Sequence, residues 1–187
     1  MTEMKKLIVI LATGFIFLYP ANAREPSFSM GNRVFNIGMG VGTNLYSGTY
    51  YSSILPPISA SLEVAVKDHI LERGILGVGG FGSFSTYRFK FSNNGWKTSD
   101  VIIGARGSFH YPFVDNLDTY SGLMLGYGII NYEFFGNYTE EDYTGGSSGL
   151  RWSWFLGARY YFREDMAFFA ELGYGVSYLN AGIAFRF

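Results

Sequence analysis

The sequence predicts an all-β fold: an eight-stranded antiparallel up-and-down transmembrane β-barrel, preceded by a cleavable signal peptide. Apolar residues recur at every second position along eight segments, which is the period of a strand with two unlike faces. Where this alternation is clear, charged residues share one face and the other face is apolar. No segment after the first twenty or so residues has the long apolar run of a membrane-spanning helix. Without such a helix, only a closed barrel satisfies the backbone polar groups in lipid.

The composition agrees with a β-rich membrane protein and excludes several other classes. Aromatic residues make up 19% of the chain and glycine contributes 25 residues, and both types disfavour helix interiors. The absence of cysteine excludes disulfides, thiolate metal sites and cysteine nucleophiles. A formal net charge of -1 provides no overall field that would attract nucleic acid. A chain of 187 residues is long enough for one domain.

The amino terminus has the pattern of a secretory signal. Lys5 and Lys6 form a positive region, an apolar run of thirteen residues follows, and Ala21-Asn22-Ala23 supplies a small-x-small cleavage site. The apolar run is shorter than the about 20 residues of a membrane-spanning helix, so a retained anchor is the less favoured alternative. The sequence therefore predicts a signal peptide over residues 1–23 and a mature barrel domain over residues 24–187.

The alternation gives seven of the eight expected strands a clear apolar phase. These phases run over 35–41, 58–66, 103–111, 123–129, 150–160, 168–174 and 179–187. The remaining strand, near 75–91, is ambiguous because both of its faces begin apolar.

The charged residues of these strands share their phase with most of the strand glycines. An arginine that faced lipid at mid-depth would cost about 2–4 kcal/mol, so this phase is expected to face the barrel interior. The interior of an eight-stranded barrel is only just wide enough for its side chains. We therefore expect a structural ion network that fills the interior, with a gated pathway for protons or small ions as the alternative. The expected members are Glu63, Arg106, Arg159, Glu171 and Arg186.

The opposite phase is rich in aromatic side chains, which suits contact with lipid and with the membrane interface. A soluble eight-stranded barrel has its apolar phase inside, so a periplasmic lipocalin-like ligand-binding barrel is the less favoured alternative. The aromatic residues expected to face lipid or the interface are Trp152, Trp154, Tyr160, Phe168 and Tyr127.

The connections alternate between long and short, as they do in outer-membrane barrels. With a periplasmic amino terminus, two long polar connections are extracellular and three shorter turns lie at the opposite end. We expect outer loops at 44–57 and 136–149, an outer turn at 93–95, a short last outer loop at 175–178, and inner turns at 67–74, 112–118 and 163–165.

The carboxyl-terminal strand resembles that of small outer-membrane β-barrel proteins of the OmpA and OmpX type. Phe187 ends the sequence, and Phe185 and Ile183 precede it at alternating positions. The segment 169–175 is similar to the penultimate strand of that family. The resemblance covers roughly 34–187 and implies an outer-membrane location and recognition of the last strand by the barrel-assembly machinery. It implies no single activity, because members include adhesins, structural anchors and lipid-modifying enzymes.

The sequence offers no pattern typical of a catalytic, metal or cofactor site. Its two histidines, His69 and His110, are too few and too distant for a metal site. A lipid A deacylase of this fold needs His, Ser and Glu on the outer wall, whereas the phase of His110 faces inward. The Gly38-x-Gly40-x-Gly42 pattern lacks the helix that follows a nucleotide-binding loop.

We therefore expect a non-enzymatic barrel of the outer membrane with a closed, charge-filled lumen. It would contribute to envelope integrity or present surface loops for interaction or adhesion, and a lipid A-modifying enzyme is the alternative. The expected partners are outer-membrane lipids and lipopolysaccharide, the barrel-assembly machinery and a surface ligand bound by the loops. We expect no nucleic acid and no oligomer.

Overall fold

The computed structural model describes residues 27–46, 48–137, 139–143 and 146–187. The predicted signal peptide, 1–23, lies outside these residues. Within them, no helix is long and apolar enough to cross a membrane.

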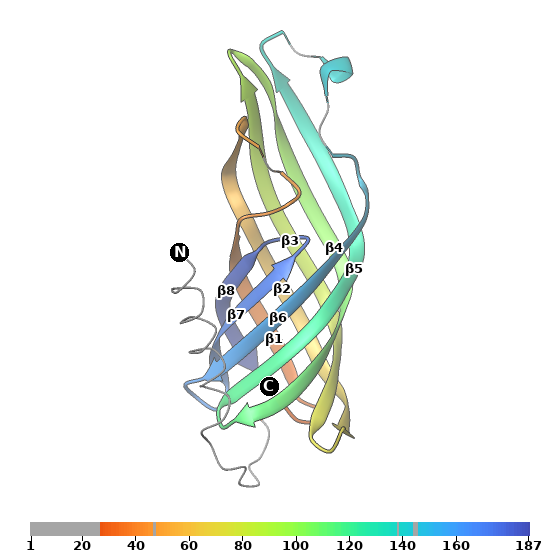
Figure 1. Ribbon diagram of the computed structural model, residues 1–187, viewed down its shortest axis with the longest axis vertical. Coiled ribbons are helices and arrows are strands. Elements are labelled where there is room, and N and C mark those ends of the chain that lie inside the picture. The colour runs from red at the N-terminus through yellow and green to blue at the C-terminus, as the bar shows by residue number, and fades with distance from the viewer. Residues whose placement is uncertain (1–26, 47, 138, 144–145) are drawn as a thin grey trace, which may run out of the picture.

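Eight antiparallel strands form a closed barrel in which each strand pairs with its neighbours in sequence and β1 pairs with β8 (Figure 1). The strands are β1 (Arg33–Val41), β2 (Tyr51–Ile70), β3 (Gly74–Phe91), β4 (Asn94–Val114), β5 (Leu117–Phe135), β6 (Gly149–Tyr161), β7 (Met166–Tyr174) and β8 (Leu179–Arg186). A short 3-10 turn, η1 (Glu140–Asp142), lies between β5 and β6. The predicted up-and-down barrel is confirmed, and its closure leaves no free sheet edge over the ring.

The two faces of the strands are sorted as the alternation predicts. Trp152 and Leu156 of β6 point outward and are 57% and 51% exposed, whereas Arg159 of the same strand is fully buried. Glu63 of β2 is likewise 0% exposed. The barrel thus has an apolar outside and an ion-containing inside, which is the reverse of a soluble barrel.

The register resolves the face assignment of β3. Gly79 pairs with Glu63 on one side and with Arg106 on the other, so it lies in the same interior row as these two charged residues. Val78 and Phe84 therefore point outward, where both are exposed. Small residues sit beside long charged ones inside the barrel.

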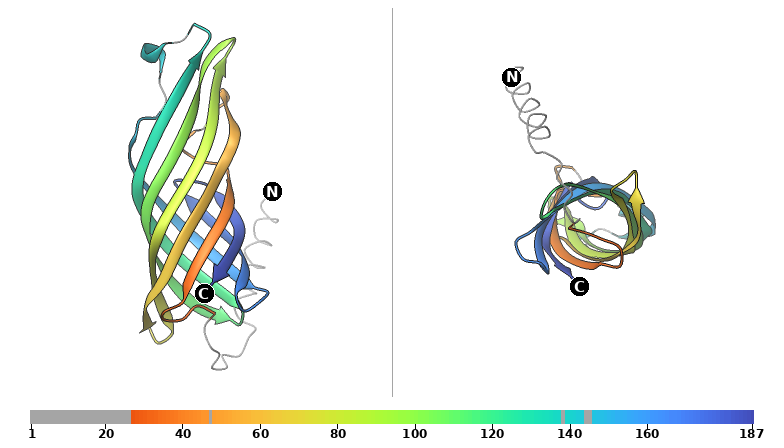
Figure 2. Two further views of the ribbon diagram at one scale, coloured as in Figure 1. Left: turned by 180° about the vertical axis from the view of Figure 1, so that it is seen from behind. Right: turned by 90° about the horizontal axis from the view of Figure 1, so that it is seen from below.

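Four strands are much longer than the other four. β2 to β5 contain 18 to 21 residues, whereas β1, β7 and β8 contain only 8 or 9. Figure 2 shows β2–β5 rising above the rest of the ring, at the end that carries the β3–β4 turn. We call this the upper end, and we call the end that carries the carboxyl terminus the lower end.

One cross-strand row marks where the complete ring ends. It runs through Met39, Ile58, Phe84, Val101 and Ile129. Above this row, 51–57, 85–91, 94–100 and 130–135 form a four-stranded sheet that lacks β1 and β6 as partners. We call this sheet the tall wall.

Three predicted loops are too long. The inner turn predicted at 67–74 spans only 71–73, because β2 continues to Ile70 and β3 begins at Gly74. The outer turn predicted at 93–95 lies at 92–93, because β4 begins at Asn94. Residues 51–57 belong to β2 rather than to a loop, because β2 accommodates Pro56 and Pro57 at a register shift between Leu55 and Ile58. The predicted turn at 112–118 is shorter in the structure, since β4 continues to Val114 and only Asp115 and Asn116 make the turn. The expected short loop at 175–178 is present.

Gly79 provides a test of the interior packing. A Cβ atom at Gly79 would overlap the carbonyl oxygen of Leu62, whereas a Cβ atom at the outward-facing Gly80 meets nothing within 4 Å. We expect Gly79→Ala to lower the free energy of unfolding by about 1–3 kcal/mol and Gly80→Ala to leave it nearly unchanged. Urea titration in lipid vesicles measures both, and equal stability of the two variants would contradict this packing.

Candidate functional site

The centre of the barrel interior is organised around one arginine. The guanidinium of Arg159 contacts Glu63 Oε2 at 2.5 Å and Asp118 Oδ2 at 2.8 Å, and its Nε donates to Asn36 Oδ1 at 3.1 Å. The Tyr120 ring stacks on it, with 4.4 Å between Cζ and the ring centroid. Charges buried this deeply are stable only when paired and hydrogen-bonded, and this arginine meets both conditions.

His110 extends this cluster by bridging its two carboxylates. Its Nδ1 lies 2.7 Å from Asp118 Oδ1, and its Nε2 lies 3.1 Å from Glu63 Oε1. The hydroxyl of Ser108, two residues earlier on β4, donates to the same Glu63 oxygen. Glu63, Asp118, His110 and Arg159 therefore form one hydrogen-bonded unit.

A separate ion pair, Arg106 with Glu171, lies above the Arg159 cluster. Arg106 Nη2 donates to Glu171 Oε1 at 2.7 Å, and its Nη1 donates to Ser61 Oγ at 3.3 Å. The Tyr120 hydroxyl donates to Glu171 Oε1 at 2.9 Å. Because the Tyr120 ring also stacks on Arg159, this tyrosine contacts both the Arg159 cluster and the Arg106–Glu171 pair. Beside Arg106 and Glu171 is a cavity of about 30 Å³, enough for a water molecule or two and too small for an organic ligand.

The structure thus brings together four of the five residues expected in the interior network: Glu63, Arg106, Arg159 and Glu171. Arg186 lies apart from them, at the lower mouth. Its guanidinium binds the carbonyl oxygens of Ser27 and Glu164 and lies 4.6 Å from the centroid of the Tyr161 ring. Arg186 is the second-last residue, and at the mouth backbone carbonyls rather than interior carboxylates are within its reach.

Two members of the network are absent from the predicted set. Asp118 was assigned to a turn, but β5 begins at Leu117 and places its carboxylate inside. The signal was present, because Asp118 shares its phase with Tyr120 and with the glycines of β5. His110 was expected to face inward, but sequence spacing gave no sign that it meets Glu63, which is 47 residues away.

The amino-terminal segment 27–32 closes the lower mouth. Phe28 is only 1% exposed and packs in an apolar cluster with side chains that include Val34, Tyr161 and Phe169. Its ring lies over His110, with 4.3 Å between the centroids. Backbone hydrogen bonds from Gly31 and to Asn32 attach the segment to Ala65 of β2. Phe28 therefore covers the ionic cluster from below.

The upper interior is filled by apolar and aromatic side chains. Ile102, Met124 and Phe155 belong to one buried cluster. Met124 pairs with Arg106 across the sheet, and the Phe155 ring lies 4.0 Å from the Arg106 guanidinium carbon. Tyr46, from the β1–β2 loop, stacks on Tyr87 at 4.5 Å and donates to Asp100 Oδ2 at 3.1 Å. Burial and the Asp100 carboxylate raise the pKa of the Tyr46 hydroxyl above its usual value, so it remains a neutral donor.

Ser108, His110 and Asp118 have the order of groups found in a catalytic triad, but their surroundings do not suit catalysis. The Ser108 hydroxyl is bound to Glu63, all three side chains are buried, and Phe28 covers the imidazole. Over the described ranges, no group of three or more His, Asp or Glu side chains is placed to hold a metal ion.

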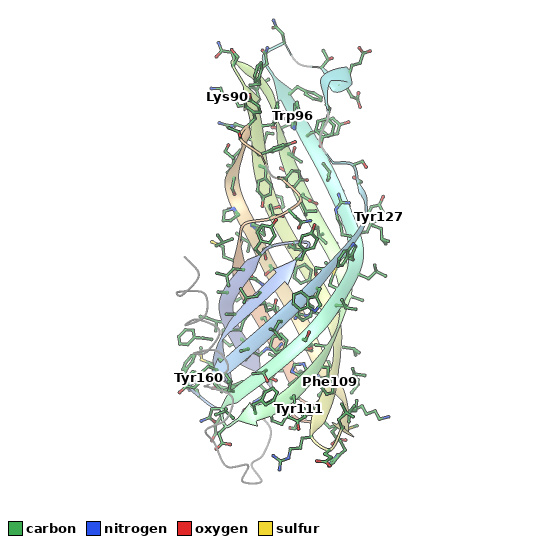
Figure 3. The ribbon with its side chains drawn as sticks, in the orientation of Figure 1. Lys90, Trp96, Phe109, Tyr111, Tyr127 and Tyr160 are labelled. Carbon is green, nitrogen blue, oxygen red and sulfur yellow. The ribbon has the colours of Figure 1, made fainter. Side chains whose placement is uncertain are left out.

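The aromatic residues expected to face lipid point away from the interior. Figure 3 shows Tyr160 near the lower end and Tyr127 higher on the barrel. All five of these residues are exposed: Trp152, Trp154, Tyr160, Phe168 and Tyr127. On the last strand, Phe185 and Phe187 are also exposed, and the role of this strand as an assembly signal stays a prediction.

No known protein-family model and no curated protein sequence matches this chain. Among solved structures, it is similar to the outer membrane protein OprG from Pseudomonas aeruginosa, with 10% identity and a TM-score of 0.53 over 87% of this chain and 99% of that one. The outer membrane protein AlkL is similar with 14% identity and a TM-score of 0.49, over 90% and 95%. Ail, the attachment invasion locus protein of Yersinia pestis, has 16% identity and a TM-score of 0.47, over 85% and 100%. The likeness to OprG shows that the chain has the fold of an outer-membrane β-barrel.

The structural role of the buried Arg159 guanidinium can be tested by substitution. We expect Arg159→Gln to lower the free energy of unfolding by about 3–5 kcal/mol, because it leaves Glu63 and Asp118 without their cation. The control is Arg163→Gln, which removes an exposed pair with Asp165 at 3.5 Å and is expected to cost about 1 kcal/mol or less. Urea unfolding followed by tryptophan fluorescence compares the two. An Arg159 variant as stable as the control would contradict the structural role of the network.

Proposed function

We propose that the protein is a non-enzymatic, non-conducting barrel of the outer membrane that presents the tall wall and its loops at the cell surface. The observation that carries this proposal is the filled interior. From bottom to top, Phe28, the Arg159 cluster, the Arg106–Glu171 pair and Tyr46 occupy successive levels of the barrel.

The height of the apolar outer surface supports a membrane span. Along β6, the outward side chains from Leu150 to Tyr160 are almost all large and apolar. This stretch is about 33 Å long, which is about 25 Å along the barrel axis at a strand tilt of about 40°. An apolar band of about 25 Å is the height of the lipid-facing belt in barrels of this kind.

The tall wall supports a role in presentation. Its inner face is packed with rings, including Phe89 stacked on Trp96 at 4.1 Å, which makes the wall a firm platform above the membrane. Its outer face is polar, with Arg88, Lys97 and Glu133 exposed or half exposed. Interaction or adhesion at the surface would use this wall and the adjoining loops.

The two alternatives fit the structure less well. A lipid-modifying enzyme needs its nucleophile where lipid can reach it, whereas Ser108 and His110 are buried behind Phe28. A soluble ligand-binding barrel needs an apolar interior, whereas this interior holds Glu63, Arg159 and their partners.

Planar-bilayer recording tests the proposal. We expect the folded protein to insert without producing stable conductance, because side chains occupy the lumen at every level. A difference in gel mobility between boiled and unboiled samples, together with co-sedimentation with vesicles, establishes that the barrel is folded and inserted. Large, stable conductance steps from protein that passes both checks would contradict a closed lumen.

A further inference from the structure

The outer face of the tall wall carries a basic groove. It has a volume of about 430 Å³ and lies against the ends of β3, β4 and β5. Its lining includes Arg88, Lys90, Lys97, Glu133, Phe134 and Phe135. Figure 3 shows Lys90 near the upper end of the molecule. Three positive side chains and one negative side chain give this groove a net positive charge.

The register places two of the positive residues face to face. Arg88 of β3 pairs directly with Lys97 of β4, and like charges in directly opposite positions destabilise a sheet. Lys97 also pairs with Glu133 of β5, but the Nζ to Oε2 distance is 3.8 Å and both side chains are well exposed, so this ion pair is weak. An anion bound between Arg88 and Lys97 would relieve their repulsion.

The next row of the sheet provides the apolar side of the groove. Lys90 pairs with Gly95, and Gly95 pairs with Phe135. The Phe135 ring occupies the space over Gly95, because a Cβ atom at Gly95 would lie only 2.8 Å from the ring Cζ. The Arg88 guanidinium lies 6.0 Å from the centroid of that ring, so the groove combines a positive rim with an apolar side.

The groove lies at the height of lipid headgroups. The last apolar row of the outer face contains Phe84, Val101 and Ile129. Four residues above this row, on the same three strands, lie Arg88, Lys97 and Glu133. Four residues are about 13 Å along a strand and about 10 Å along a tilted barrel axis. The headgroup region begins where the hydrocarbon core ends, and long basic side chains bend several ångströms toward it.

One acidic residue of the neighbouring loop, Glu140, is held away from this positive charge. Glu140 of η1 accepts a hydrogen bond from the Tyr132 hydroxyl at 2.9 Å. Tyr132 pairs with the buried Thr98, so Tyr132 belongs to the inner face of the sheet. Glu133, the next residue on β5, belongs to the outer face. The Glu140 carboxylate is thus held on the other side of the wall from the groove.

We propose that this basic groove binds the phosphate-bearing headgroup of an outer-leaflet lipid. Arginine binds phosphate oxygens through paired N–H donors and lysine adds point charges, so Arg88, Lys90 and Lys97 suit a phosphate monoester. The acyl chains would descend along the exposed Phe84 and Ile129. The inference rests on the proposed membrane span, and it adds a specific lipid contact to the platform.

Native mass spectrometry of the folded protein in phosphatidylcholine nanodiscs, with and without phosphatidic acid, tests this site. The groove variant is Arg88→Gln with Lys90→Gln and Lys97→Gln. The matched control is Lys67→Gln with Arg73→Gln and Arg163→Gln, which removes the same charge near the lower end. We expect wild type and control to retain phosphatidic acid in preference to phosphatidylcholine, and the groove variant to lose about 10- to 100-fold of that preference.

Any other outcome of this experiment would overturn the inference. Equal loss in the control would mean that total charge, rather than the groove, attracts the lipid, and full retention in the groove variant would exclude these residues. Inorganic phosphate is added as a competitor, and displacement of phosphatidic acid at equal concentration would assign the groove to free phosphate instead of a lipid. If the protein lacked the gel-mobility shift and failed to enter nanodiscs, the proposed membrane span would be wrong. That outcome is distinct from loss of lipid preference in a protein that does insert, which concerns the groove alone.

Discussion

The constraint on which the structure depends is that every charge excluded from the lipid-facing surface must be neutralised inside a narrow cylinder. Arg159 shows how this is met, because its guanidinium reaches Glu63, Asp118 and Asn36 while the Tyr120 ring stacks on it. In a low-dielectric interior, such a cation is tolerated only with all of these partners in place. The interior therefore acts as one unit, in which the loss of a single member leaves buried charges unpaired.

This constraint also fixes the strand register. A slip of one residue would turn the interior face of a strand outward, so that Glu63 or Arg159 would meet lipid and Leu62 or Tyr160 would enter the lumen. Glycine supports the register as well, because Gly77 leaves the space that the Glu63 side chain occupies: a Cβ atom at Gly77 would lie 2.5 Å from Glu63 Oε1. Charge and size thus select the same pairing.

The sequence predicts most of the ring, because alternation is a local property of each strand. It predicts the outward face of β6, with Trp152 and Tyr160, for that reason. It leaves β3 ambiguous, because both faces of that strand begin apolar and only pairing with Glu63 and Arg106 assigns them. Contacts between distant parts of the chain are not local, so neither the position of Phe28 beneath His110 nor the separate role of Arg186 can be predicted from spacing. The tall wall is missed in part because the long polar stretch 44–57 predicts a loop, whereas β2 continues through its last seven residues with a register shift at the prolines.

The most direct measurement is a spin-label scan along 123–129 of β5 in lipid vesicles. The sequence has no cysteine, so single cysteine variants can be labelled without background. Labels at the outward positions Leu123, Leu125 and Tyr127 are predicted to be accessible to oxygen dissolved in lipid and protected from a water-soluble nickel chelate. Labels at Met124 and Gly126 are predicted to be protected from both reagents, because they face a filled interior. Accessibility of Leu125 to the nickel chelate, or the absence of alternation along this strand, would contradict the sorting of the two faces between lipid and a closed lumen.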